Sequence, residues 1–173
     1  FRSTGVRHEG VAPYRRLMEA RSRLVVMASG AGSNLQAVLD ACAEGRLPAQ
    51  VVSVVSDVAG AGALRRAAAA GVPAEVVERQ ANEPRRAYDR RLADAVAGHE
   101  PHWVVLAGFM RLLSSDFLDH FPGRVVNLHP ALPGELPGLH AIERAHAEAA
   151  TAGRTHTGVM VHLVPDEGVD DGP

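Results

Sequence analysis

The sequence predicts an α/β protein built on an open, mostly parallel sheet, and two regularities of the 173-residue chain support this. Short apolar runs alternate along the chain with segments whose apolar residues recur at helical spacing. Most of these runs are nearly continuous, which is typical of strands buried on both faces of a parallel sheet. Strands and helices that alternate in this way are joined by right-handed crossovers.

Six short apolar runs are expected to form the strands. Each is bounded by Gly, Pro, Ser or charged residues, which mark turns. In the last run Val159, Val161 and Leu163 alternate with other residues. In chain order the expected strands are residues 23–29, 51–55, 74–77, 103–107, 124–128 and 159–163.

Four segments have helical periodicity. The first two are followed directly by glycine, a common helix terminator. Asn82 can cap the third, with Pro84 in its first turn and with Tyr88, Leu92 and Val96 on its buried face. The expected helices are residues 33–44, 62–70, a third that starts near Asn82, and 140–152.

Length and composition favour one domain in residues 23–173, preceded by an N-terminal extension or tag in residues 1–22. That first stretch is rich in Arg and lacks the continuous apolar region of a secretory signal. No apolar run approaches the roughly 20 residues of a membrane span, so no membrane partner is expected. A net charge of −2 does not favour nucleic acid as a partner. The single cysteine, Cys42, has an apolar helical neighbourhood and is interpreted as a core thiol, and a cytoplasmic location follows as the expectation.

The chain contains no lysine, because all 18 of its Lys and Arg residues are Arg. Schiff-base chemistry on a lysine, a pyridoxal-phosphate site and a Walker-type phosphate loop are therefore excluded within these residues. The nine histidines are scattered without metal-ligand spacing, and no metal site is expected.

The stretch Asn-Leu-His-Pro at residues 127–130 is the most informative in the chain. Residues two apart on a strand project to the same face, so Asn127 and His129 should lie side by side at the end of the fifth strand. Acyl transfer needs such a pair, since an amide can hold a developing oxyanion while an imidazole moves a proton. The acidic residues 166–171 offer carboxylates that could orient and charge this histidine.

Two further loops follow strands and should lie at the same edge of the sheet, where ligands of open α/β sheets bind. The Ser-Gly-Ala-Gly-Ser-Asn loop at residues 29–34 can place backbone N–H groups near an anion, typically phosphate. It fails the full dinucleotide fingerprint because Leu35 stands where Gly or Ala is needed, so a ribose contact by Asp57 has little support. In the loop at residues 108–113, Phe109 and Met110 could flank a planar ring and Arg111 could meet an anion, although taken alone these residues favour lid or core roles.

Four motifs together resemble the phosphoribosylglycinamide (GAR) formyltransferases of purine biosynthesis. They are the residues 29–36, 106–113, 126–130 and 166–173, and a match at residues 84–90 adds to them. The resemblance runs in the right order from about Leu24 to Pro173. It implies a Rossmann-like open, mostly parallel twisted sheet with helices on both faces, and formyl transfer from 10-formyltetrahydrofolate to the amine of GAR without a metal.

The resemblance also implies roles for individual residues. The matching catalytic residues are Asn127, His129 and Asp170, and those at the GAR phosphate are Gly32, Ser33 and Asn34. Residues matching the folate site are Arg85 near the tail, then Met110, Arg111, Leu112 and Leu113 on the pocket wall, Asn127, and Pro165, Asp166, Glu167, Gly168, Val169 and Asp170 around the pterin. His162 matches a strand histidine that we interpret as structural.

The chain departs from the family pattern in three places. Residues 133–138 shift a proline and lack an aromatic residue, and Gly168 is an extra residue in the pterin loop. The family fold continues beyond the residue that matches Pro173, so its C-terminal part is expected to be absent. Two alternatives stay open: a formyltetrahydrofolate deformylase, against which Pro130 argues, and a nucleotide-binding module without catalysis. A homodimer is a possible assembly.

Overall fold

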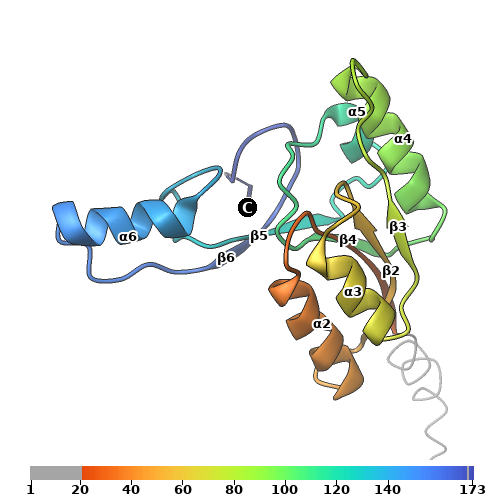
Figure 1. Cartoon of the computed structure of the whole chain (residues 1–173), viewed down its shortest axis with the longest axis horizontal. Coiled ribbons are helices and arrows are strands. Elements are labelled where there is room, and N and C mark those ends of the chain that lie inside the picture. Colours follow the sequence, from red (N-terminus) through yellow and green to blue (C-terminus); the bar gives the residue numbers. More distant parts are fainter. Residues whose placement is uncertain (1–20, 171) are drawn as a thin grey trace, which may run out of the picture.

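The computed structural model describes residues 21–170 and 172–173, whose strands form a six-stranded sheet (Figure 1). The strand order is β3-β2-β1-β4-β5-β6, with β1 to β5 parallel and β6 antiparallel to β5. This confirms the predicted open, mostly parallel sheet. The strands are β1 (Ser22–Met27), β2 (Ala49–Ser56), β3 (Ala74–Val76), β4 (Trp103–Leu106), β5 (Val125–His129) and β6 (Met160–Leu163).

Helices cover both faces of this sheet. Val25 and Met27 of β1 enter one buried cluster, while Leu24 and Val26 enter another. Since alternate residues of a strand face opposite sides of the sheet, both faces bury apolar side chains and need a covering layer. The first cluster includes residues of α4 and α5, and the second includes residues of α2 and α3. The helices are α2 (Ser33–Ala43), α3 (Gly62–Ala69), α4 (Arg85–Ala97), α5 (Ser115–Leu118) and α6 (Ala141–Thr151).

Two features of the helices differ from the sequence expectation. The N-cap of α4 is Pro84, not Asn82, which lies in the preceding turn with a φ of 62°. Asparagine adopts this left-handed conformation more readily than most residues, which suits Asn82 to the turn. The helix α5 was not predicted, because four residues are too few to show a helical period, yet its Phe117 is completely buried.

The strand order reverses between β1 and β4, which start the two halves of the sheet. The loops that follow these neighbouring strands are tied together at this point. The Ser29 N–H donates to the Gly108 carbonyl at 3.0 Å, and the Met110 N–H donates to the Ser29 hydroxyl at 2.8 Å. Such a reversal opens a crevice at the carboxyl ends of the strands, where ligands of open α/β sheets bind.

The α6 helix and the segment that leads from it to β6 extend from the sheet as an arm (Figure 1). Val159 and Val161, whose alternation predicted a strand here, are exposed, whereas His162 between Val161 and Leu163 is buried. None of the helices in the described ranges is long and apolar enough to cross a membrane. The expected N-terminal extension, apart from Arg21 and Ser22, lies outside the described residues, and Ser22 already begins β1.

Candidate active site

The β5 strand and the acidic loop after β6 bring Asn127, His129 and Asp170 together. The Asn127 Nδ2 donates to Asp170 Oδ1 at 2.9 Å, and the His129 Nδ1 lies 3.2 Å from Asp170 Oδ2. Asn127 and His129 reach the same carboxylate because they project from one face of β5, as their spacing predicts. The geometry therefore assembles an amide, an imidazole and a carboxylate, the groups expected for acyl transfer.

The His129 ring lies between two hydrogen-bond acceptors. Its Nδ1 faces the Asp170 carboxylate, and its Nε2 lies 2.9 Å from the carbonyl oxygen of Leu136. A neutral imidazole has one N–H, so only the imidazolium donates to both partners at once. The ring is 4% exposed, and this arrangement suits the protonated form of His129.

His162 is part of the same cluster, although from the sequence we interpreted it as structural. It lies directly opposite Asn127 in the antiparallel pairing of β5 and β6. Its Nδ1 faces the Leu163 carbonyl at 2.8 Å, and its Nε2 lies 3.2 Å from the Asn127 Nδ2. A neutral His162 with its proton on Nδ1 satisfies both contacts, since Nε2 then accepts from the amide. No pattern in the sequence identified this role, because the burial of His162 depends on the register of β6 against β5.

The carboxylates of the acidic loop have distinct partners. Asp170, with a φ of 53°, also accepts a 2.7 Å hydrogen bond from the Gly138 N–H. Asp166 accepts from the Gly168 N–H at 2.8 Å, which closes a local turn. Glu167 points to the arginines of α4, and Asp171 lies outside the described residues. Among the described carboxylates of this loop, Asp170 is therefore the one that contacts His129.

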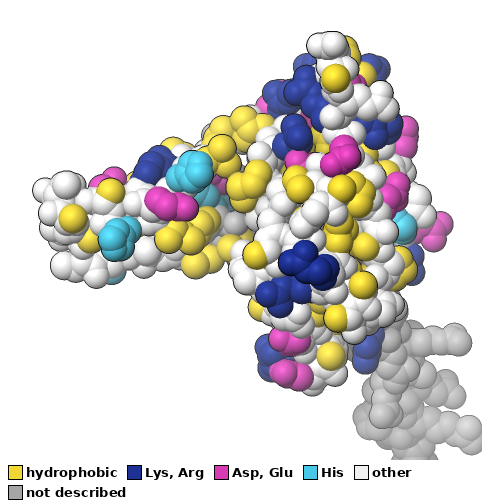
Figure 2. Space-filling view, in the orientation of Figure 1, with side chains coloured by type: hydrophobic (Ala, Val, Ile, Leu, Met, Phe, Trp, Pro, Cys, Tyr) yellow, Lys and Arg dark blue, Asp and Glu magenta, His cyan; other side chains and the backbone are white. Residues whose placement is uncertain are grey.

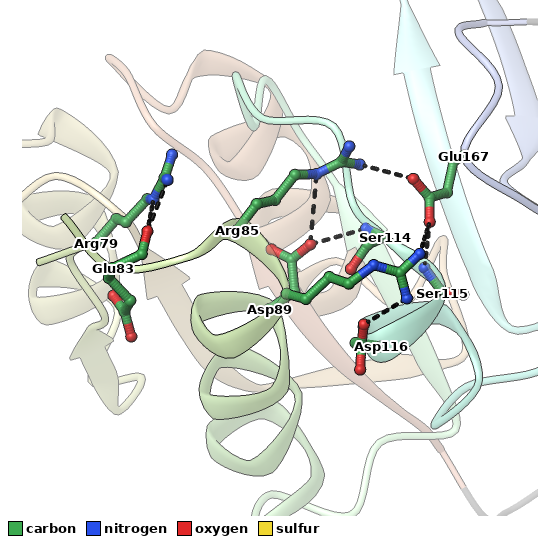
Figure 3. Close-up of polar contacts among 9 residues, drawn as sticks. Arg79, Glu83, Arg85, Asp89, Ser114, Ser115, Asp116 and Glu167 are labelled. Carbon is green, nitrogen blue, oxygen red and sulfur yellow. Dashed lines mark hydrogen bonds and ion pairs between the residues drawn. The ribbon is translucent and has the colours of Figure 1, made fainter.

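An ion-pair network joins the acidic loop to the start of α4 (Figure 3). Arg85 lies 3.4 Å from Glu167 and 3.7 Å from the buried carboxylate of Asp89. Asp89 in turn accepts from the Ser114 N–H at 2.9 Å, and Glu167 accepts from the Ser115 N–H at 3.0 Å. Two residues expected at the folate, Arg85 and Glu167, are thus brought together from segments far apart in the sequence.

The glycine-rich loop leads into α2, whose N-cap is Gly32. Gly32 has a φ of 76°, and a Cβ there would lie 2.7 Å from the Cα of Ala63 in α3. Glycine is therefore required by backbone conformation and by helix packing. Ser33 is exposed and Asn34 is half-buried, so these two residues present the helix start to solvent.

The loop after β4 presents alternate residues to solvent. Met110 and Leu112 are exposed, whereas Phe109 and Leu113 are buried. Figure 2 shows exposed hydrophobic side chains gathered where the arm meets the body of the sheet. The exposed side chains of Met110 and Leu112 can form an apolar wall for a planar ring.

The side chain of Arg111 reaches Asp57 and the Tyr88 ring, although it is still 36% exposed. Its Nε donates to Asp57 at 2.6 Å, and its guanidinium lies 5.4 Å from the centre of the Tyr88 ring. The Asp57 carboxylate is thereby committed to a protein cation. Burial, followed by the nearby Asp57 charge, raises the pKa of Tyr88 to about 12.

No group of three or more His, Cys, Asp or Glu side chains in residues 21–170 and 172–173 has an arrangement that could hold a metal ion. The cluster of Asn127, His129 and Asp170 offers groups for hydrogen bonding and proton transfer. Such a cluster at the carboxyl edge of a sheet with a strand-order reversal suits group transfer of the acyl type.

Comparison with known proteins agrees with that class. The family model described as formyl transferase matches residues 22–173, and the chain belongs to this family. Phosphoribosylglycinamide formyltransferase of Escherichia coli is 43% identical over 150 residues, which cover 87% of this chain and 68% of that protein. The protein of the same name from Mycobacterium tuberculosis is 46% identical over 161 residues, covering 93% of this chain and 72% of that one.

A solved structure shares the fold. Glycinamide ribonucleotide transformylase 1 from Symbiobacterium toebii superposes with a TM-score of 0.81 at 42% sequence identity, covering 88% of this chain and 70% of that one. This chain therefore spans about two thirds to three quarters of the length of these relatives.

Proposed function

We propose that this chain transfers a formyl group from 10-formyltetrahydrofolate to the amine of GAR, a step of purine biosynthesis. The observation that carries the proposal is the cluster of Asn127, His129 and Asp170 at the crevice of a formyl transferase fold. The names of the relatives at 43% and 46% identity support GAR as the acceptor.

The folate would lie between the loop after β4 and the acidic loop. The exposed side chains of Met110 and Leu112 offer apolar surface to a planar pterin, and residues 165–169 are exposed beside Asp170. Arg85 is close enough to this loop to pair with Glu167, and it carries the positive charge that an anionic folate tail requires. Bound there, the folate supplies an activated formyl group.

The start of α2 would hold the phosphate of GAR. Ser33 and Asn34 present backbone N–H groups and polar side chains at a helix N-terminus, where an anion is favoured. Gly32 contributes indirectly, because only glycine lets this helix start pack against Ala63. The GAR amine can then approach the formyl carbon near His129.

Catalysis would proceed by attack of the amine on the formyl carbon, with charge developing on the formyl oxygen. His129 stabilises that oxygen through its Nε2–H, and Asp170 holds the imidazolium in place through Nδ1. Both amide hydrogens of Asn127 are directed at Asp170 and His162, so its donation to the oxygen requires exchange of one of these bonds. The new carbon–nitrogen bond forms first, and transfer of an amine proton to the folate nitrogen then allows the folate carbon–nitrogen bond to break.

Steady-state kinetics with both substrates test the proposal. We expect formation of tetrahydrofolate that depends on GAR and saturates in each substrate, followed spectroscopically. Release of formate in the absence of GAR, at a rate similar to that in its presence, would instead identify a deformylase. Dinucleotide binding without folate binding would identify a nucleotide-binding module.

The setting of this activity is also a proposal. Purine biosynthesis from soluble substrates is consistent with a cytoplasmic enzyme, which fractionation of cells with an antibody to the chain would test. A homodimer stays a prediction, and sedimentation equilibrium over a range of protein concentrations would decide it.

A further inference from the structure

The loop of residues 132–138 lies over the catalytic histidine. Its Leu136 has a φ of 47°, a conformation that is uncommon for a residue with a side chain. In this conformation the Leu136 carbonyl oxygen lies 2.9 Å from His129 Nε2. The same nitrogen is the one that the proposed mechanism directs at the formyl oxygen.

Arg144, in the first turn of α6, holds this loop in place. Its Nη2 donates to the Leu136 carbonyl at 2.7 Å and to the Pro137 carbonyl at 2.6 Å. Its Nε is buried and has no hydrogen-bond partner among the described residues. The side chain is therefore partly desolvated, and its recorded hydrogen bonds are directed at two successive carbonyls of the loop.

The loop is also connected to the other end of the imidazole. The Gly138 N–H donates to Asp170 Oδ2, the oxygen that faces His129 Nδ1. One turn of chain thus supplies an acceptor to His129 Nε2 and a donor to its carboxylate partner. A change in the position of this loop must alter the surroundings of His129 on both sides.

We infer that Arg144 is a positioning residue that clamps residues 132–138 in a closed position, in which the Leu136 carbonyl occupies His129 Nε2 and substrate must displace it. A single N–H serves one strong acceptor at a time, so the formyl oxygen and the Leu136 carbonyl compete for the same hydrogen bond. Arg144 stabilises the closed loop and not the open one. Only molecules with the loop open can then bind the formyl donor productively. The apparent affinity for the donor is lower by the fraction of molecules in which the loop is closed.

Three variants test this clamp. Arg144→Gln removes the charged donor, Arg144→Lys keeps a positive charge with a different geometry, and Arg46→Gln is a matched control. Arg46 is an exposed arginine that pairs with Glu44 after α2. The Lys variant also carries the test if the Gln variant does not fold.

The first measurements need no substrate. In Arg144→Gln, we expect the Gly138 amide to exchange with solvent at least about tenfold faster than in wild type. Nitrogen-15 NMR of the His129 ring should show that Nε2–H has lost its carbonyl partner. In Arg144→Lys, the Gly138 exchange rate and the His129 ring signal should lie between those of wild type and Arg144→Gln. In Arg46→Gln, both should match wild type. Unchanged exchange at Gly138 and an unchanged His129 ring in Arg144→Gln would overturn the clamp.

The kinetic measurement rests on the proposed formyl transfer. In Arg144→Gln, KM for 10-formyltetrahydrofolate should fall at least about threefold, while kcat changes by a smaller factor. A rise in KM, with the loop shown to be released, would overturn the competition between Leu136 and the substrate. If wild type transfers no formyl group at all, the proposed function fails, but the Gly138 and His129 signals still decide the clamp.

Discussion

Asp170 is the residue on which the proposed site depends most, and Asp170→Asn is the sharpest test of its role. The carboxylate faces three donors, from Asn127, His129 and the Gly138 backbone. An asparagine replaces one acceptor oxygen with an NH₂ group, so that two donors then face each other. Loss of one hydrogen bond to a charged group costs about 3 kcal/mol at the upper end. If that loss falls on the transition state, turnover decreases about 10²-fold.

The assay combines turnover with the state of the His129 ring. Steady-state transfer rates give the loss in kcat, and nitrogen-15 NMR reports which ring nitrogens carry a proton. Asp94→Asn, on an exposed position of α4, is the control and should match wild type in both measurements. Turnover by Asp170→Asn within tenfold of wild type, with an unchanged ring, would refute the role given to Asp170.

Three further predictions follow from the structure. Asn127→Ala and His129→Ala should each reduce turnover at least about 10²-fold, and the double mutant should be little worse than the poorer single mutant; additive losses in kcat would show that the two do not act together. Gly32→Ala should lower the free energy of unfolding by about 1–3 kcal/mol, because the new Cβ is strained at a φ of 76° and lies too close to Ala63. A thermal unfolding curve unchanged from wild type would contradict the packing role of Gly32. The contribution of Tyr88 to stability should be constant below about pH 10, its unfolded-state pKa, and fall by about 2–3 kcal/mol as pH rises to about 12, where the folded protein loses that proton. Denaturant titrations should show a larger alkaline fall in wild type than in Tyr88→Phe, and an equal fall in both would contradict the prediction.

The sequence was sufficient for the parts of the site that depend on local spacing. Asn127 and His129 had to share a face because they are two residues apart in a strand. Their position at the edge of the crevice followed from the βαβ pattern, since the carboxyl ends of parallel strands lie together. The buried face of α4, with Tyr88, was likewise visible from helical periodicity.

The sequence was not sufficient for features that depend on register and packing between distant segments. His162 joins the cluster because β6 pairs antiparallel to β5 with His162 opposite Asn127. A shift of one residue in that pairing would have exposed His162, and nothing in four residues of strand fixes the register. The commitment of Arg111 to Asp57 is similarly a contact across 54 positions of sequence.

Gly32 shows a different limit of sequence reasoning. The glycine-rich pattern indicated close approach of a phosphate to the backbone, whereas the structure gives a second reason for glycine. The missing side chain leaves room for Ala63 of α3, which lies 31 positions further along the chain. A pattern of glycines indicates where the backbone lies close to a ligand or to another segment of the chain. The fold decides which of the two it is.

Transfer of a carbon-13-labelled formyl group tests the central claim most directly. The label would start on 10-formyltetrahydrofolate, with GAR as acceptor, and carbon-13 NMR would follow it. We predict that the formyl signal moves to the amide of the GAR product with wild type, and that His129→Ala slows this at least about 10²-fold. A label that appears in formate, or that moves to GAR equally fast without His129, would contradict the account.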